Sequence, residues 1–104
     1  MPYATPLTDA ELTSALASLP EWTREGALIR RTIRVADFRA AIALVNAVAD
    51  AAEAANHHPD ICITSYRTVS FELTTHAAGA LTQRDADLAG EIEQILSGAH
   101  QEGG

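Results

Sequence analysis

Residues 53–85, EAANHHPDICITSYRTVSFELTTHAAGALTQRD, decide the fold and hold most of the reactive side chains of the chain. The stretch contains the end of an alanine-rich segment, two segments rich in β-branched residues, and the start of another helical pattern. It also holds three of the four histidines and the only cysteine. The remaining sequence is mostly alanine, leucine and small polar residues, a composition typical of scaffold.

The middle of this stretch, 60–75, has the composition of two β-strands. Val69, Phe71 and Leu73 alternate with polar residues, which is the pattern of a strand with one buried face. Ile61 and Ile63 alternate in the same way closer to the N-terminus. The interruption near 65–67 indicates a hairpin turn or a bulge between the two strands.

A long helix is expected before these strands, at 37–56. Asp37 is a favourable residue for capping its first turn. Pro59 requires an end near Asn56 or His57, because the residue before a proline is disfavoured in the α region. One face of the segment carries a continuous apolar stripe of Phe38, Ala41, Ile42, Val45, Val48, Ala49 and Ala52.

A further helix is expected after the strands. Thr82 and Asp85 form an N-terminal capping pattern ahead of a helical apolar stripe, and Gly98 is predicted to end the helix. We therefore expect an ordered core at about 7–97 and a mobile tail at 98–104.

The N-terminal part of the chain predicts one more helix and two strands. Thr8 and Glu11 form a capping box for a helix at 9–19, which Pro20 ends. Residues 21–35 then have strand composition with a turn at Glu25-Gly26. The alternation is imperfect, because Arg31 falls on the same face as apolar residues.

The resulting order is α-β-β-α-β-β-α. Pairs of strands separated by helices predict antiparallel pairing in an α+β fold. A chain of 104 residues is expected to form a single domain, 1–104.

Composition excludes several classes of function. The formal net charge is −7, and all seven basic residues are arginines. Nucleic acids and anionic membrane surfaces are therefore unfavourable partners, and Schiff-base chemistry on a lysine is excluded.

No apolar run spans a bilayer, no secretory signal is apparent, and one cysteine allows no intramolecular disulfide. We expect a cytoplasmic protein.

The histidines indicate acid–base chemistry. His57 and His58 lie at a helix end and His76 at a strand end, so a hairpin packed beside the helix would bring the three rings together. Glu53 precedes His57 by four residues and would meet it on one helix face if the helix extends that far. Imidazole titrates near pH 6.5, so such a cluster can supply a proton donor and a proton acceptor for a dehydration.

The same three histidines could supply an open zinc site. Adjacent histidines point apart on most backbones, and the sequence has neither an H-x-x-x-H nor an H-x-H pair. We therefore expect no metal.

Several residues are spaced at fixed intervals through 53–85, namely Glu53, His57, His58, Pro59, Tyr66, His76 and Asp85. The pattern resembles the signature of the pterin-4a-carbinolamine dehydratases. Trp22 and the pair Asp37-Phe38 also stand where that family places them, and the resemblance covers about residues 20–97. It implies a four-stranded antiparallel sheet with three helices on one face, in homodimers or homotetramers.

The resemblance also implies an activity. The family are hydro-lyases that convert 4a-hydroxytetrahydropterin to quinonoid dihydropterin by losing water, which recycles the pterin cofactor of aromatic amino-acid hydroxylases. No cofactor is implied, since the pterin is the substrate. The catalytic histidines map onto His57, His58 and His76, with His57 and His76 as the acid–base pair and His58 positioning the ring. Glu53 would orient His57 or bind the pterin.

Three points remain open. The family often has aspartate before the histidine pair, where this chain has Asn56. Asp85 is either a substrate-binding residue or part of a helix cap. A non-catalytic pterin-binding or assembly module on the same fold is the alternative function.

Overall fold

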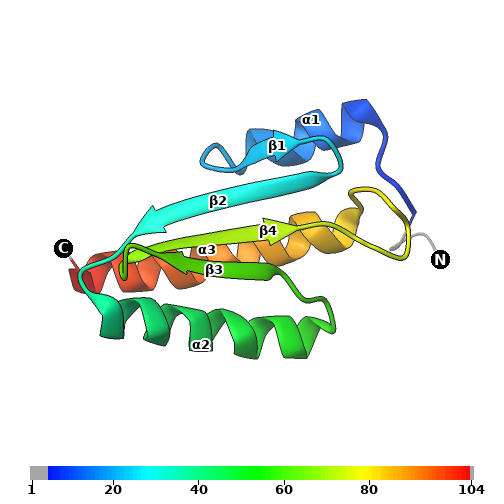
Figure 1. Ribbon diagram of the computed structural model, residues 1–104. Coiled ribbons are helices and arrows are strands. Elements are labelled where there is room, and N and C mark those ends of the chain that lie inside the picture. Colours follow the sequence, from blue (N-terminus) through cyan, green and yellow to red (C-terminus); the bar gives the residue numbers. More distant parts are fainter. Residues whose placement is uncertain (1–4, 104) are drawn as a thin grey trace.

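The computed structural model describes residues 5–103, with side chains described through residue 98, and it has the predicted order of elements (Figure 1). The three helices and four strands are α1 (Asp9–Ala17), β1 (Thr23–Glu25), β2 (Leu28–Arg34), α2 (Phe38–Ala55), β3 (Asp60–Thr64), β4 (Thr68–Leu73) and α3 (Gln83–Gly103). The predicted helix at 9–19 is thus two residues shorter than expected, and the others begin where their caps indicate.

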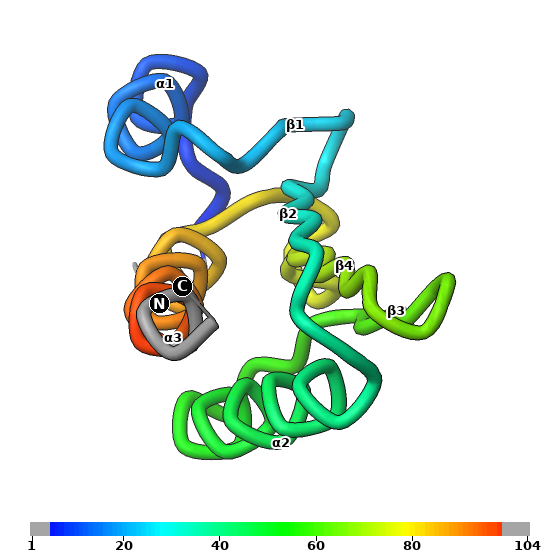
Figure 2. The backbone as a smooth tube through the Cα atoms, turned by 90° about the vertical axis from the view of Figure 1, so that its left-hand side faces the viewer, coloured from blue at the N-terminus to red at the C-terminus, as the bar shows by residue number. Residues whose placement is uncertain are grey.

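The four strands form one antiparallel sheet in the order β1-β2-β4-β3. Two hairpins, β1-β2 and β3-β4, therefore meet through β2 and β4 at the centre of the sheet. Figure 2 shows α1, α2 and α3 all on one side of the sheet, which confirms the expected architecture. In the β3–β4 turn, Ser65 and Tyr66 have positive φ angles, so the interruption seen in the sequence is a tight turn.

The core lies between the inner face of the sheet and the helices. Val69, Phe71 and Leu73 of β4 are completely buried, as the alternating pattern predicts. The helices contribute a second layer of buried residues, which are Leu12 and Leu19 from the α1 region, Ala41, Leu44, Val48 and Ala52 from α2, and Leu88, Ala89, Ile92 and Leu96 from α3. Burial of this apolar surface stabilises the packing of both halves of the chain on one sheet.

Arg31, which interrupted the apolar face of β2, has a specific partner. Its Nε donates to Oε2 of Glu93 on α3 over 2.8 Å, and the Trp22 indole nitrogen donates to the same oxygen over 2.9 Å. The arginine therefore lies on the helical side of the sheet without an unpaired charge, because α3 supplies a carboxylate there. The contact joins the sheet to α3.

The end of α2 sets the direction of the chain into the histidine pair. Asn56 adopts the left-handed conformation with φ 50° and ψ 43°. The backbone N–H of Asn56 donates to the Glu53 carbonyl, and that of His57 donates to the Ala52 carbonyl. This is a Schellman motif, which ends a helix and turns the chain sharply. Asparagine suits the position because it tolerates positive φ better than most residues.

The predicted end of the last helix is wrong. Gly98 was expected to end it, but α3 continues to Gly103. Among the described glycines only Gly26 and Gly79 have positive φ, so Gly98 does not adopt the left-handed conformation of a C-terminal cap. A glycine inside a helix costs only about 1 kcal/mol relative to alanine and does not by itself stop it. Mobility of 98–104 stays a prediction, since the side chains beyond residue 98 lie outside the described part.

The Gly98→Ala variant tests this helix end. A Cβ at residue 98 would meet no atom within 4 Å, and alanine is the better helix former. We expect the free energy of unfolding to rise by up to about 0.5–1 kcal/mol, measured by urea denaturation. Gly79→Ala is the contrasting variant. Gly79 has φ 62°, a conformation that alanine rarely adopts, so we expect this variant to be less stable than the wild type. Destabilisation by Gly98→Ala would instead indicate a glycine cap.

Candidate active site

The candidate site lies at one end of the molecule, where three chain segments meet (Figure 1). These are the link from α2 to β3, the turn after β4, and the first turn of α3. The turn after β4 is closed by backbone hydrogen bonds in which Thr75 N–H donates to the Ala80 carbonyl and Gly79 N–H donates to the His76 carbonyl. The sheet, α2 and α3 thus determine where these residues lie.

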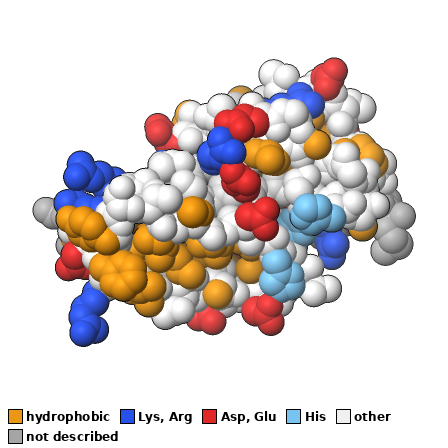
Figure 3. Space-filling view, viewed as in Figure 1, with side chains coloured by type: hydrophobic (Ala, Val, Ile, Leu, Met, Phe, Trp, Pro, Cys, Tyr) orange, Lys and Arg blue, Asp and Glu red, His pale blue; other side chains and the backbone are white. Residues whose placement is uncertain are grey.

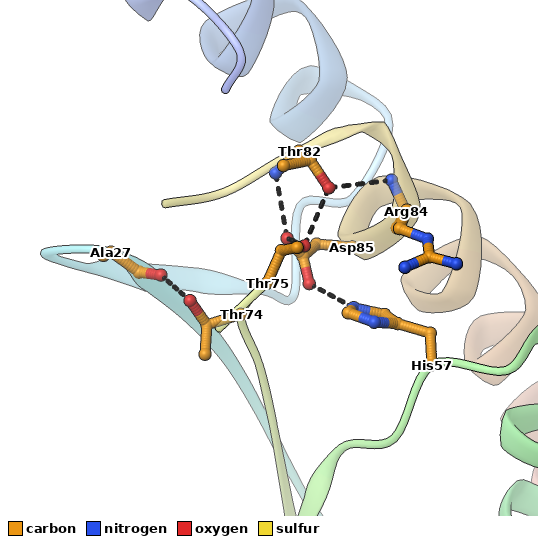
Figure 4. Close-up of polar contacts among 7 residues, drawn as sticks. All are labelled: Ala27, His57, Thr74, Thr75, Thr82, Arg84 and Asp85. Carbon is orange, nitrogen blue, oxygen red and sulfur yellow. Dashed lines mark hydrogen bonds and ion pairs between the residues drawn. The ribbon is translucent and has the colours of Figure 1, made fainter. Parts of the chain in front are cut away.

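His57 is held at this end by a buried carboxylate. The residue is only 8% exposed, and Nε2 lies 2.6 Å from Oδ1 of Asp85 on α3 (Figure 4). The two residues are separated by 28 positions in sequence, so the contact depends on the packing of α2 against α3. A carboxylate on one ring nitrogen fixes the orientation of an imidazole.

Asp85 is the centre of the polar cluster at this end. It is 1% exposed, and its Oδ2 accepts from the Thr75 hydroxyl over 2.8 Å and from the Thr82 backbone N–H over 2.9 Å. With His57 on Oδ1, both carboxylate oxygens are engaged. A buried carboxylate needs such partners to offset the loss of water. Asp85 also lies in the first turn of α3, where the helix dipole favours negative charge.

Asp85 makes the contacts of a helix cap, and its role in substrate binding stays a prediction. The sequence predicts either substrate binding or helix capping for this residue. Its contacts are those of a helix cap, with one additional contact to His57. The Thr82 hydroxyl accepts from Arg84 N–H over 3.2 Å, which completes the capping arrangement. Asp85 therefore contacts the site through the His57 ring.

Glu53 pairs with His58, and the expectation that it orients His57 is wrong. Nε2 of His58 lies 2.5 Å from Oε2 of Glu53, and both side chains are largely exposed. The four-residue spacing from Glu53 to His57 would have placed the two on one helix face, but α2 ends at Ala55 and Asn56 turns the chain. Glu53 thereby holds the outer histidine at the edge of the site.

His76 lies in the turn after β4, directly beyond Thr75, and its side chain is exposed. Its ring makes no hydrogen bond or ion pair with any side chain described between residues 5 and 98. Figure 3 shows histidine side chains on the surface at this end of the molecule, with acidic side chains beside them. His76 is thus accessible to a ligand, whereas His57 is almost completely buried.

The described residues form no cluster of three or more His, Cys, Asp or Glu side chains with the geometry of a metal site. His57 and His58 each use Nε2 on a different carboxylate, Asp85 and Glu53. This arrangement can support proton transfer and hydrogen bonding.

Two site residues were missed from sequence. Thr75 and Thr82 are 2% and 0% exposed, their hydroxyl oxygens are 2.7 Å apart, and both contact Asp85 (Figure 4). The spacing of Thr82 and Asp85 indicated a helix cap. No local pattern indicated that His57 and Thr75 would meet that cap, because the two residues lie 28 and 10 positions from Asp85 in sequence.

Residues 5–95 match the family model described as pterin 4 alpha carbinolamine dehydratase. The chain belongs to this family. A relative from Nocardia farcinica (strain IFM 10152) is 55% identical over 86% of this chain and 93% of its own length. One from Roseiflexus sp. (strain RS-1) is 53% identical over 89% of this chain and 99% of its own length. Both carry the name "Putative pterin-4-alpha-carbinolamine dehydratase".

Solved structures share the dehydratase family fold. The crystal structure of a transcriptional coactivator/pterin dehydratase from Brucella melitensis superposes with a TM-score of 0.82 and 29% identity, covering 88% of this chain and 98% of that one. A pterin dehydratase-like protein identified as a RuBisCO assembly factor in the alpha-carboxysome superposes with a TM-score of 0.57 at 15% identity, over 71% and 84% of the two chains. The second likeness is one of fold alone.

Replacement of Asp85 should cost far more stability than replacement of Glu53. Asp85→Ala leaves the Thr82 N–H, the Thr75 hydroxyl and the His57 ring short of a partner inside the protein. We expect a loss of about 2–4 kcal/mol in the free energy of unfolding, measured by urea denaturation.

Glu53→Ala is the matched control, because it removes the other carboxylate–histidine contact from an exposed position. We expect a change within about 0.5 kcal/mol. Equal losses from the two variants would contradict the central position assigned to Asp85.

Proposed function

We propose that this protein dehydrates 4a-hydroxytetrahydropterin to quinonoid dihydropterin, as a hydro-lyase. The observation that carries the proposal is the pair of unlike histidines at one end of the fold. His57 is buried against Asp85, and His76 is exposed and unpaired among the described side chains. Membership of the pterin carbinolamine dehydratase family supports a pterin as the substrate.

The reaction requires one proton to be given and one to be taken. The C4a–O bond breaks as the hydroxyl accepts a proton and departs as water. The proton on N5 is removed, and the electrons of its N–H bond form the C4a–N5 double bond. We assign His57 and His76 as the acid–base pair, since imidazole exchanges protons near neutral pH.

His58 is the third member of the proposed site. Its contact with Glu53 restrains the ring at the edge of the site. We propose that this pair positions the pterin, with His58 contacting the ring and Glu53 available to the polar amino-pyrimidinone edge. Histidine and glutamate offer both donors and acceptors for such a contact. No separate cofactor or metal enters the proposed reaction.

The proposed setting is the cytoplasm, beside an aromatic amino-acid hydroxylase that produces the carbinolamine. No helix of the described residues, 5–103, is long and apolar enough to cross a membrane. The single cysteine, Cys62, is exposed, which suits a reducing compartment.

We further propose that the protein forms a homodimer or homotetramer. Among the described side chains, three large apolar ones are exposed, Phe38 at 52%, Ile42 at 40% and Tyr66 at 59%. Figure 3 shows apolar side chains gathered over the end of the molecule opposite the histidines, where α2 begins and the β3–β4 turn lies. An exposed apolar patch of this kind is typical of an interface.

The alternative function is a non-catalytic pterin-binding or assembly module. It is favoured by one observation, the likeness in fold to the protein described as a RuBisCO assembly factor. The two functions differ in whether loss of a histidine abolishes turnover while assembly is retained.

The dehydratase proposal is tested by the decay of freshly generated 4a-hydroxytetrahydropterin, followed by ultraviolet absorbance with and without protein. We expect the wild type to accelerate the decay. His57→Ala and His76→Ala should each reduce that acceleration by about 10²–10⁴-fold, the usual contribution of one general acid or base.

Gln94→Ala is the control, because it alters an exposed α3 residue that is not part of the site. It should retain full activity, and sedimentation should give one assembly state for all four proteins. A folded, assembled wild type that does not accelerate the decay would exclude the dehydratase and favour the assembly module.

A further inference from the structure

We propose that Thr75 and Thr82 are positioning residues that act through Asp85 to keep a proton on Nε2 of His57, which leaves Nδ1 as the nitrogen that exchanges a proton with the substrate. The role of Nδ1 in turnover rests on the proposed dehydratase function. The assignment of the tautomer rests on the hydrogen bonds alone.

The hydrogen bonds around the two threonines have one direction. The Thr75 hydroxyl donates its only proton to Oδ2 of Asp85 over 2.8 Å. Its contact with the Thr82 hydroxyl over 2.7 Å must therefore use the Thr82 proton. The Thr82 oxygen in turn accepts from Arg84 N–H. Each hydrogen bond in this series therefore donates in the direction of Asp85.

The arrangement leaves Asp85 as an acceptor on both oxygens. Oδ2 accepts from the Thr75 hydroxyl and the Thr82 N–H, so neither contact takes a proton from Asp85. An ionised carboxylate has no proton to give, so the 2.6 Å contact between Oδ1 and His57 requires a proton on Nε2. Asp85 is 1% exposed, which leaves little room for water to take the place of either partner.

The second ring nitrogen is then the reactive one. Nδ1 of His57 has no hydrogen-bond partner among the described side chains, and in the neutral ring it carries a free lone pair. A proton taken there makes an imidazolium whose charge lies against Asp85, which stabilises it. The threonines therefore support proton transfer without contacting the substrate.

A purely structural role for Thr75 is the competing explanation, since a buried hydroxyl needs a partner for stability alone. The two explanations differ in their effect on the His57 ring. The loss of a contact that serves stability alone leaves the tautomer unchanged. The loss of the Thr75 contact that holds the Asp85 carboxylate in place frees Oδ1 to turn away from the ring and weakens the preference for a proton on Nε2.

The test combines nitrogen NMR of ¹⁵N-histidine-labelled protein with the decay assay. At pH about 8.5, where imidazole is usually neutral, we expect wild-type His57 to show a protonated Nε2 and a bare Nδ1. Thr75→Val, which keeps the side-chain shape, should give a mixture of tautomers and lower kcat about tenfold with little change in KM. Thr75→Ser, which keeps the donor, should restore both.

The outcomes separate the two proposals. A protonated Nδ1 in the wild type would overturn the inference whatever the activity, and this spectrum requires no variant to fold. An unchanged tautomer and unchanged kcat in folded Thr75→Val would overturn the role of Thr75. Wild-type protein with a protonated Nε2 but no turnover would support the tautomer and overturn the dehydratase function.

Discussion

The arrangement of the site depends on one buried carboxylate. Asp85 has lost nearly all contact with water, and it is stable there because donors from three separate segments reach it. His57 follows α2, Thr75 follows β4, and Thr82 precedes α3. The carboxylate therefore ties both helices to the sheet at the end where the histidines lie. The geometry of the candidate site and the packing have the same origin here, because the contact that orients the His57 ring also satisfies a buried charge.

Most of the fold was accessible from sequence because its signals are local. The alternation of Val69, Phe71 and Leu73 and the capping box of Thr8 and Glu11 each involve only a few neighbouring residues, and both appear in the structure. Arg31 is unexpected on the apolar face of its strand, and only its contact with Glu93 on α3 explains the position. Gly98 was misinterpreted because a glycine indicates a cap only when the chain turns there. Local sequence does not indicate whether a helix ends at such a glycine or continues past it.

The same limit applied to the site. The histidines were recognised by residue type and spacing, but their partners were assigned by proximity in sequence. Glu53 was paired with His57 by helical periodicity, and the turn at Asn56 redirected the ring to Asp85. The two carboxylates thus have different surroundings, one exposed beside His58 and one buried beside His57. Such a difference arises only from tertiary packing, so the family resemblance could identify the residues but not their pairing.

The Schellman motif at the end of α2 has a consequence for how the chain can change in length. Each residue of an α-helix advances the direction of the side chains by about 100°. An insertion or deletion of one residue within α2 would therefore rotate the point at which the chain leaves the helix and turn His57 away from Asp85. The turn at Ser65 and Tyr66 lies at the opposite end of the sheet and has no such constraint. Insertions and deletions should therefore be absent from α2 in homologous chains.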